Sequence, residues 1–308
     1  MKFLIIGDLH GRMPRIHYKD FDAIIAPGDF CSDKELGPIY KKWFKHLKKY
    51  SGKKLKKVPE FDEFIGKYAS KKEVKNMEKR SLAQGRKILK FLNSFGKPVF
   101  ITPGNWDQSY GPTRIKDINK NSYTYRKAFA DWWLGKYTNK KLTKGLKNIH
   151  DCQYKLHKFQ EFNIIGYGLS SGPEAPKSKY KIGDSKKQDI KKLNLAYKKL
   201  VKQLDSAYKT RDRSKPTIFL SHNVPYKTKV DVVVNKASYA HNLHVGSSVA
   251  RQFCERHKPI VCIGGHVHEH HKKTTMKGTP VINAGYGAKV NTLLETKNGK
   301  IKDIKFFG

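Results

Sequence analysis

Acidic residues are scarce in this sequence: 26 Asp and Glu stand against 64 Lys and Arg among 308 residues, a formal net charge of +38. A chain this positive attracts polyanions, which favours nucleic acid or an anionic surface as a partner. However, the excess is mostly lysine spread along the whole length, and a lysine-rich proteome explains it equally well. Charge alone therefore does not decide between a functional basic surface and a lysine bias of the whole proteome.

Cysteine is also rare, and long apolar runs are missing. The four cysteines have no CxxC spacing and are too few for a disulfide framework in a chain of this length, which favours reduced thiols in a cytoplasm. No apolar run reaches the roughly 18 residues of a membrane span. The opening "MKFLIIGDLHG" has too short an apolar run for a signal peptide and is typical of a first strand instead. We therefore expect a cytoplasmic protein without a membrane span.

Six short apolar runs, each ending in a polar or glycine-containing turn, predict buried strands. They lie at residues 3–8, 22–29, 98–105, 217–222, 259–266 and 280–288. Asn298-Gly299 predicts a hairpin turn near the end of the sequence, and helical periodicity predicts helices at 81–95, 189–208 and 247–256. This alternation indicates an α/β layered fold. We interpret it as one domain over residues 1–308, with basic insertions at about 34–80 and 108–150.

Polar side chains follow five of the predicted strands. In chain order they are Asp8, His10, Asp29, Asn105, His222, His266 and His268. Because ligands of open α/β sheets bind beyond the carboxyl ends of the strands, we expect these side chains to converge on one crevice. Their mixed nitrogen and oxygen donors suit manganese, iron or zinc better than calcium. Seven donors are too many for one tetrahedral ion, whereas two ions sharing Asp29 could bind a bridging hydroxide and assist displacement at phosphorus.

The motifs GDLHG, PGD, PGNWD, SH and GGHVH, in this order, resemble the signature of the calcineurin-like metallophosphoesterase superfamily. The resemblance spans nearly the whole chain and is greatest to small, stand-alone prokaryotic or archaeal phosphoesterases. It implies a β-sandwich flanked by helices, with two divalent metal ions at the strand ends. Manganese is the metal we expect, with iron, zinc and nickel as alternatives. The ligand set that the resemblance implies is Asp8, His10 and His268 for one ion, Asn105, His222 and His266 for the other, and Asp29 between them.

Two positions depart from the superfamily pattern. Trp106 stands where the pattern has a histidine that helps to protonate the leaving group, and Ser32 and Asp33 shift the second acid of GDxxD by one place. Losing the histidine lowers the rate by about 10²–10⁴-fold and most affects poor leaving groups. Some branches that lack this histidine hydrolyse phosphodiesters. Trp106 is either a stacking platform for a nucleobase or, the commoner role, a residue that packs into the sheet edge.

These observations predict a dinuclear metal-dependent phosphodiesterase, in which a metal-bridging hydroxide attacks phosphorus. The predicted catalytic residues are Asp29, Asn105, His244 and Arg12. Arg12 is expected to pair with a substrate phosphate, and His244 to replace the missing acid, with His241 and His270 as alternatives. A phosphomonoesterase, or a non-catalytic module that binds nucleic acid or protein, are the alternative functions. The substrate, possibly a nucleotide or nucleic acid, and the oligomeric state are left open.

Overall fold

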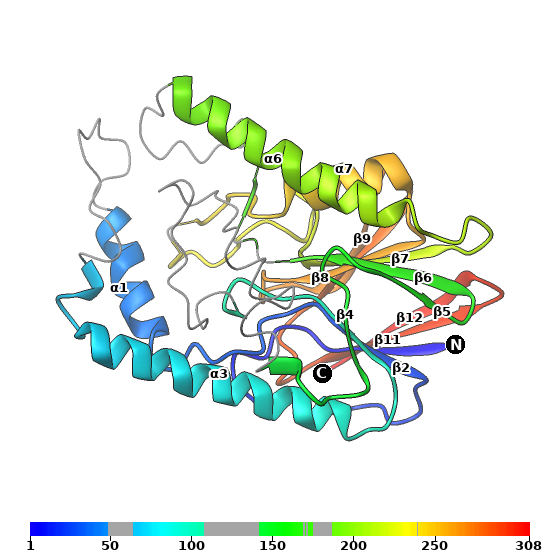
Figure 1. Cartoon of the computed structure of the whole chain (residues 1–308), viewed down its shortest axis with the longest axis horizontal. Helices are drawn as coiled ribbons and strands as arrows, with labels where there is room; N and C mark the ends of the chain where they lie inside the picture. Colours follow the sequence, from blue (N-terminus) through cyan, green and yellow to red (C-terminus); the bar gives the residue numbers. More distant parts are fainter. Residues whose placement is uncertain (49–63, 108–141, 169, 171, 175–186, 239) are drawn as a thin grey trace.

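The computed structural model describes residues 1–48, 64–107, 142–168, 170, 172–174, 187–238 and 240–308. Two six-stranded sheets lie face to face, and helices cover their outer sides (Figure 1). This arrangement confirms the predicted α/β sandwich flanked by helices. In these described residues, no helix is both long enough and apolar enough to cross a membrane.

The first sheet has the order β12-β11-β1-β2-β3-β4. Its strands are β1 (Lys2–Ile5), β2 (Ala23–Ala26), β3 (Val99–Ile101), β4 (Ile149–Asp151), β11 (Asn291–Lys297) and β12 (Lys300–Phe307). Strands β1 to β4 run parallel, and the β11–β12 hairpin pairs antiparallel with β1. Asn298 and Gly299 both have positive φ, 51° and 70°, as a two-residue hairpin turn of this twist requires. The predicted hairpin is therefore confirmed.

The second sheet has the order β5-β6-β7-β8-β10-β9. Its strands are β5 (Leu156–Phe159), β6 (Phe162–Tyr167), β7 (Thr217–Asn223), β8 (Val261–Gly265), β9 (His271–Met276) and β10 (Thr279–Ala284). The four inner strands are parallel, and β5 and β9 are antiparallel edges. The carboxyl ends of the parallel strands in both sheets thus become available for a shared site.

Alternating side chains explain why the strands read as continuous apolar runs. Phe3 and Ile5 of β1 face the second sheet and share a core with Ile218 of β7, whereas Leu4 faces outward against Leu89 of a helix. Around the inner strands both faces of each sheet are covered, so neither face needs polar residues there, whereas β12 and β9 at the edges carry exposed polar residues. Burial of each such side chain contributes roughly 1.5–3 kcal/mol.

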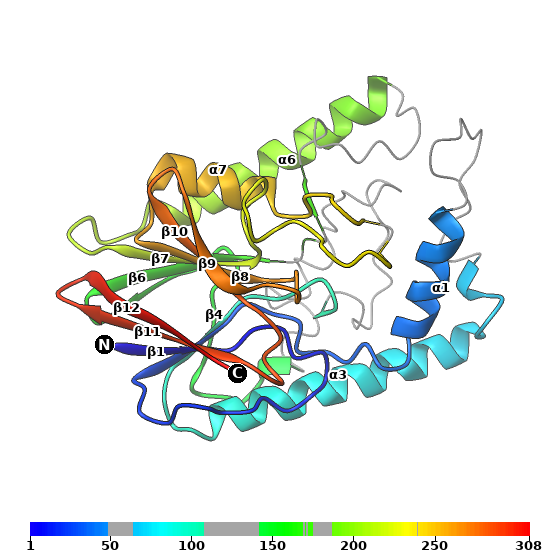
Figure 2. The same cartoon turned by 180° about the vertical axis from the view of Figure 1, so that it is seen from behind.

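Four longer helices complete the layers: α1 (Gly37–Lys48), α3 (Lys71–Asn93), α6 (Lys187–Tyr208) and α7 (Ser248–His257). Helix α3 covers the first sheet, and α6 and α7 cover the second (Figure 1). Figure 2 shows α1 at the end of the sandwich that lies away from the N-terminus. Since β1 starts at that terminus, α1 lies toward the carboxyl ends of the parallel strands.

The structure differs from the sequence prediction in several elements. Helix α3 begins at Lys71 rather than 81, because Ser70 and Glu73 form a reciprocal capping box there. The predicted insertion 34–80 therefore contributes the start of a helix that packs on the first sheet, as well as α1. Most of the insertion at 108–150 lies outside the described residues, although its end forms β4. Strands β4, β5, β6 and β9 were not predicted, and the single-domain interpretation stays a prediction.

Candidate metal centre

The predicted ligands follow the strands through sharp turns. His10, Asp29 and His266 have positive φ values of 46°, 58° and 71°, a region that costs a non-glycine residue about 1–3 kcal/mol. Glycines make the close approach possible: a Cβ on Gly104 would lie 2.0 Å from Asp29 Oδ1. Strained backbone of this kind is concentrated at functional sites, where the surrounding structure holds it in place.

One half of the centre is formed by His10, His268, Asp8 and Asp29. The Nε2 atoms of His10 and His268 are 3.0 Å apart. Asp8 Oδ2 lies 3.3 Å from His268 Nε2, and Asp29 Oδ2 lies 3.5 Å from His10 Nε2. Ligand atoms around a cation at about 2.0–2.2 Å are separated by about 3–3.5 Å, so this spacing fits a shared ion.

The other half is formed by Asn105, His222, His266 and Asp29. Asn105 Oδ1 lies 2.7 Å from His222 Nε2 and 2.9 Å from His266 Nδ1. Asp29 Oδ2 is also 3.5 Å from His222 Nε2, so this oxygen faces both halves. The donor atoms of Asp29, His222 and His266 lie within 4.8 Å of one another. All seven predicted ligand residues are therefore gathered at one place.

A backbone contact fixes which nitrogen of His222 is available. His222 Nδ1 lies 2.9 Å from the carbonyl oxygen of Pro27, and a carbonyl can only accept, so Nδ1 carries the proton. Nε2 then presents a lone pair toward Asn105 and Asp29, as a metal ligand needs. Asp8 Oδ1 is buried without a hydrogen-bond partner. A buried carboxylate oxygen without a hydrogen-bond partner, within a cluster of carboxylates and imidazoles, fits a bound cation.

Burial dominates the electrostatics of the centre. It raises the pKa of Asp29 well above its usual range, and repulsion from Asp8 adds to this. Burial also lowers the pKa of His10 well below its usual range, with a further contribution from His268. For Asp8, burial acts to raise the pKa, but the hydrogen bond with His268 and the charge of His222 lower it to about 2. Burial acts to lower the pKa of His268, but the hydrogen bond with Asp8 raises it. Close carboxylates and imidazoles are a donor set that divalent cations stabilise.

Residues 1–270 match the sequence profile of the family described as calcineurin-like phosphoesterase. The chain belongs to this calcineurin-like phosphoesterase family. Members of the family normally hold a dinuclear divalent metal site, and the cluster around Asp29 is the candidate here. Among curated protein sequences, none matches this chain significantly.

Solved structures are similar to this chain in fold. One of them is 16% identical, with a TM-score of 0.59 over 100% of this chain and 99% of its own. TT1561 of Thermus thermophilus is 12% identical, with a TM-score of 0.49 over 99% of this chain and 97% of its own. The phosphopantetheinyl hydrolase PptH from Mycobacterium tuberculosis is also 12% identical, with a TM-score of 0.49 over 93% and 90%. At these identities the first likeness shows the fold alone.

Asp107 is a site residue whose role the sequence analysis missed. Its buried carboxylate accepts backbone N–H groups from Asp29, Phe30 and Cys31 at 3.0, 3.0 and 2.9 Å. It also accepts the N–H of Gly104 at 2.8 Å. One carboxylate therefore joins the turn that carries Asp29 to the turn that carries Asn105. The acid three positions after the Pro-Gly turn was the only sequence signal for this role.

Trp106 is held beside the centre by its own backbone. Its N–H donates to Asp29 Oδ1 at 2.7 Å, and its partly buried ring packs against the first core. The indole meets the rings of His10 and Tyr40 edge to face, with centroids 6.0 and 5.2 Å apart. The ring thus packs between a predicted ligand and helix α1, and it brings no labile proton to the site.

Arg12 lies close to the centre but is already paired. Its Nη1 donates to the carbonyl oxygen of His10 at 3.1 Å and to Asp33 Oδ1 at 2.9 Å. Half of its side chain is exposed. The shifted acid of the second motif, Asp33, therefore orients this guanidinium, and Arg12 retains donors for an anion.

His244 forms a pair with a buried carboxylate. Its Nδ1 lies 2.7 Å from Asp231 Oδ1, and the imidazole is 37% exposed. The pair belongs to a loop next to the ligand loop, because Val232 pairs with His244 and accepts a hydrogen bond from His270. His270 itself is buried and uses its Nε2 in that 2.8 Å bond, which argues against it as a replacement acid. His244 contacts Asp231 by its hydrogen bond and Tyr226 by its ring, and neither partner is a predicted metal ligand.

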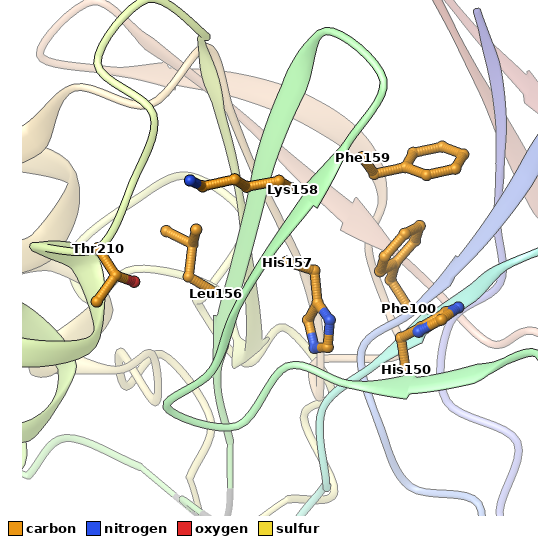
Figure 3. Close-up of a pocket in the computed structure, with 7 residues that line it drawn as sticks. All are labelled: Phe100, His150, Leu156, His157, Lys158, Phe159 and Thr210. Atoms are coloured by element: carbon orange, nitrogen blue, oxygen red, sulfur yellow. The ribbon is translucent and has the colours of Figure 1, made fainter.

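A separate cavity of about 510 Å³ opens between β3, β4 and β5 (Figure 3). It is lined by Phe100, His150, Leu156, His157, Lys158, Phe159 and Thr210, and it shares no residue with the candidate centre. His157 Nε2 is bonded to the carbonyl oxygen of Asp151 at 2.7 Å, and His150 stacks on Phe100. These imidazoles are engaged in packing and backbone contacts.

Proposed function

We propose that this protein is a dinuclear metal-dependent hydrolase of phosphodiesters. The observation that carries the proposal is the convergence of seven candidate ligand side chains from five strand ends, in a chain of the calcineurin-like phosphoesterase family. The predicted ligands of one ion are Asp8, His10 and His268, those of the other are Asn105, His222 and His266, and Asp29 is shared. This mixed donor set suits manganese, with iron, zinc and nickel as competitors.

When bound, a pair of divalent cations lowers the pKa of a bound water and neutralises charge on phosphoryl oxygens. The chain's own residues prepare that chemistry. Pro27 fixes the tautomer of His222, and Asp107 holds the turns of Asp29 and Asn105 together. Arg12, oriented by Asp33, is placed in this proposal to donate to a phosphate oxygen.

Trp106 is the reason for preferring diesters. An indole cannot donate its N–H as a labile proton, so the rate has to come from the metal pair and from the quality of the leaving group. His244 is the proposed acid for poorer leaving groups. The Asp231 carboxylate supports this role because it binds Nδ1 and leaves Nε2 as the exchangeable nitrogen, the arrangement of a carboxylate–imidazole pair.

The test is manganese-dependent hydrolysis of a bis-aryl phosphodiester against the matching aryl monoester. Asp29→Asn is the inactive variant, and Asp20→Asn, at the exposed end of the Lys2 ion pair, is its matched control. Faster diester turnover that is lost only in Asp29→Asn supports the proposal. Faster monoester turnover contradicts the diester preference, and a protein that neither binds metal nor turns over either ester contradicts the hydrolase assignment.

A second experiment tests the acid. His244→Gln and Asp231→Asn should each reduce hydrolysis of an alkyl diester by about 10–10²-fold, with little change for an aryl diester whose leaving group needs no proton. Equal losses for both esters show that the pair only supports the loop, and His244 is then not the acid.

A further inference from the structure

Two aromatic side chains flank the pair of imidazoles at the candidate centre. The rings of His10 and His268 have centroids 4.7 Å apart. Trp106 lies beyond His10, at 6.0 Å, and Tyr286 lies beyond His268, at 5.8 Å. Both aromatic residues are partly exposed. We call Trp106 and Tyr286 the aromatic rim.

Backbone hydrogen bonds tie each member of the aromatic rim to a predicted metal ligand. The N–H of Trp106 donates to Asp29 Oδ1 at 2.7 Å. The residues around Tyr286 pair with Asp8: the N–H of Asp8 donates to Gly285 at 3.2 Å, and the N–H of Gly287 donates to Asp8 at 2.9 Å. These hydrogen bonds hold the aromatic rim at a fixed position relative to the candidate metal ligands, where a phosphate would bind.

A cation contacts the Tyr286 side of the aromatic rim, and lysines of α1 follow the residue that contacts Trp106. The guanidinium carbon of Arg12 lies 5.8 Å from the centre of the Tyr286 ring. On the other side, Trp106 contacts Tyr40 of α1 at 5.2 Å. Lys41 and Lys42 follow Tyr40 directly and are exposed, with Lys42 Nζ 4.5 Å from the ring of Tyr68. Aromatic rings beside cationic side chains are the combination that binds nucleotides, because bases stack on the rings while phosphates meet the positive charge.

We propose that the aromatic rim makes this a site for a phosphodiester with a nucleoside on each side of the phosphate, as in a single-stranded oligonucleotide or a dinucleotide. The inference rests on the proposed hydrolysis of diesters. A diester carries two arms, and the rim provides one aromatic side chain for each. Stacking is tolerant of base identity, so the site distinguishes nucleosides from aliphatic alcohols rather than one base from another.

The experiment compares a dinucleoside monophosphate with an aliphatic phosphodiester of the same charge. The quantity measured is the ratio of kcat/KM for the two substrates in Trp106→Leu and Tyr286→Leu. Tyr18→Leu is the matched control, because Tyr18 is also a partly exposed aromatic residue but lies beside Lys2, at the opposite end of β1. Loss of one stacking contact should lower the ratio by about 5- to 150-fold, mainly through KM for the dinucleoside, and leave the ratio in Tyr18→Leu unchanged.

A binding measurement separates this inference from the hydrolase proposal. Metal-free protein is titrated with a short single-stranded oligonucleotide, and tryptophan emission is recorded for the wild type and for Trp106→Leu. Quenching in the wild type that is absent in the variant supports nucleoside binding at the aromatic rim. This holds even if no ester is hydrolysed, because missing hydrolysis contradicts only the proposed function. If diesters are hydrolysed but the substrate ratio is unchanged in both rim variants, the nucleoside inference is overturned and the hydrolase proposal stands. If a longer oligonucleotide binds with no higher affinity than a dinucleotide, the dinucleotide is assigned as the ligand.

Discussion

The Asp107 carboxylate accepts the backbone N–H of Asp29 at 3.0 Å, across 78 positions of sequence. This contact holds the shared ligand of the candidate metal centre in a left-handed backbone conformation, with φ 58°. The same carboxylate accepts the N–H of Gly104 at 2.8 Å. It thereby sets the distance between the loop of Asp29 and the loop of Asn105 before any cation binds.

The first prediction concerns Asp107→Asn. The amide keeps one accepting oxygen, but its NH₂ group faces two backbone donors that lose their partner. Each buried unsatisfied donor costs about 1–3 kcal/mol, so metal-free protein should lose about 2–6 kcal/mol of unfolding free energy. Metal affinity should also fall by about 10–100-fold, because an outer partner of a ligand has been removed.

Urea unfolding and metal titration measure these two effects of Asp107→Asn separately. Glu174→Gln is the matched control, since Glu174 is a buried carboxylate that accepts the N–H groups of Ser248 and Val249 and touches no predicted ligand. It should change stability but leave metal affinity as in the wild type. An Asp107→Asn protein that binds metal normally contradicts the positioning role.

The second prediction concerns Gly104→Ala. An added Cβ would lie 2.0 Å from Asp29 Oδ1 and 2.3 Å from Asp29 N, so the shared ligand has to move. We expect at least a tenfold loss of metal affinity, and a loss of activity that is greater still. Gly278→Ala is the control, because Gly278 has φ +85° and nothing within 4 Å of its added Cβ. It should lose about 1 kcal/mol of stability and no metal, as elemental analysis of the purified variants will show.

The convergence of the candidate ligands could be predicted from sequence because each stands at the end of an apolar run, a local pattern, while their binding of metal stays a prediction. Asp107 could not be assigned, because its partners at 29–31 lie in another loop and only the folded chain brings them together. Strand β6 was missed for a similar reason. Asn163 and Gly166 interrupt its apolar run, and the Asn163 amide is satisfied by the distant carbonyls of Asp212 and Lys215.

The ring contacts of Trp106 were also beyond the sequence. The motif fixed its place beside Asn105, but the contact with Tyr40 depends on how α1 packs against the end of the sandwich. Core residues cover one part of the indole, which is the packing role, and the residue stays partly exposed, so the stacking role stays a proposal.

The third prediction follows from this position. Trp106→His restores the imidazole that the superfamily pattern has there and keeps the backbone N–H that donates to Asp29. The new side chain should raise kcat for alkyl esters by about 10–10²-fold, since general-acid help typically contributes about 10²–10⁴-fold. Aryl esters, whose leaving groups need no proton, should change little. The effect is measured with a series of esters that differ in leaving-group pKa. The rate of Trp106→His should depend less steeply on leaving-group pKa than the wild-type rate, and an equally steep dependence contradicts the prediction. Trp106→Gln, which is polar but cannot act as an acid, is the control.

The last prediction concerns pH and a carboxylate away from the metal centre. Glu174 Oε1 accepts hydrogen bonds from the hydroxyls of Tyr167 and Ser247, and Oε2 accepts the first backbone N–H groups of α7. Burial nevertheless raises its pKa above the usual 4.5. The folded protein therefore keeps a proton on Glu174 at pH values where the unfolded chain has released it.

A group whose pKa is raised on folding makes the unfolding free energy fall as the pH rises through the interval between the two pKa values. Each unit of elevation is equivalent to about 1.4 kcal/mol. Urea unfolding of the metal-free wild type and of Glu174→Gln, measured from pH 4.5 to about 7.5, should show the wild type losing stability relative to the variant as the pH increases. Because glutamine does not titrate, the difference between the two proteins isolates this one carboxylate. A difference that stays flat, or that grows in favour of the wild type with rising pH, means that the hydrogen bonds at the start of α7 outweigh burial and keep Glu174 ionised.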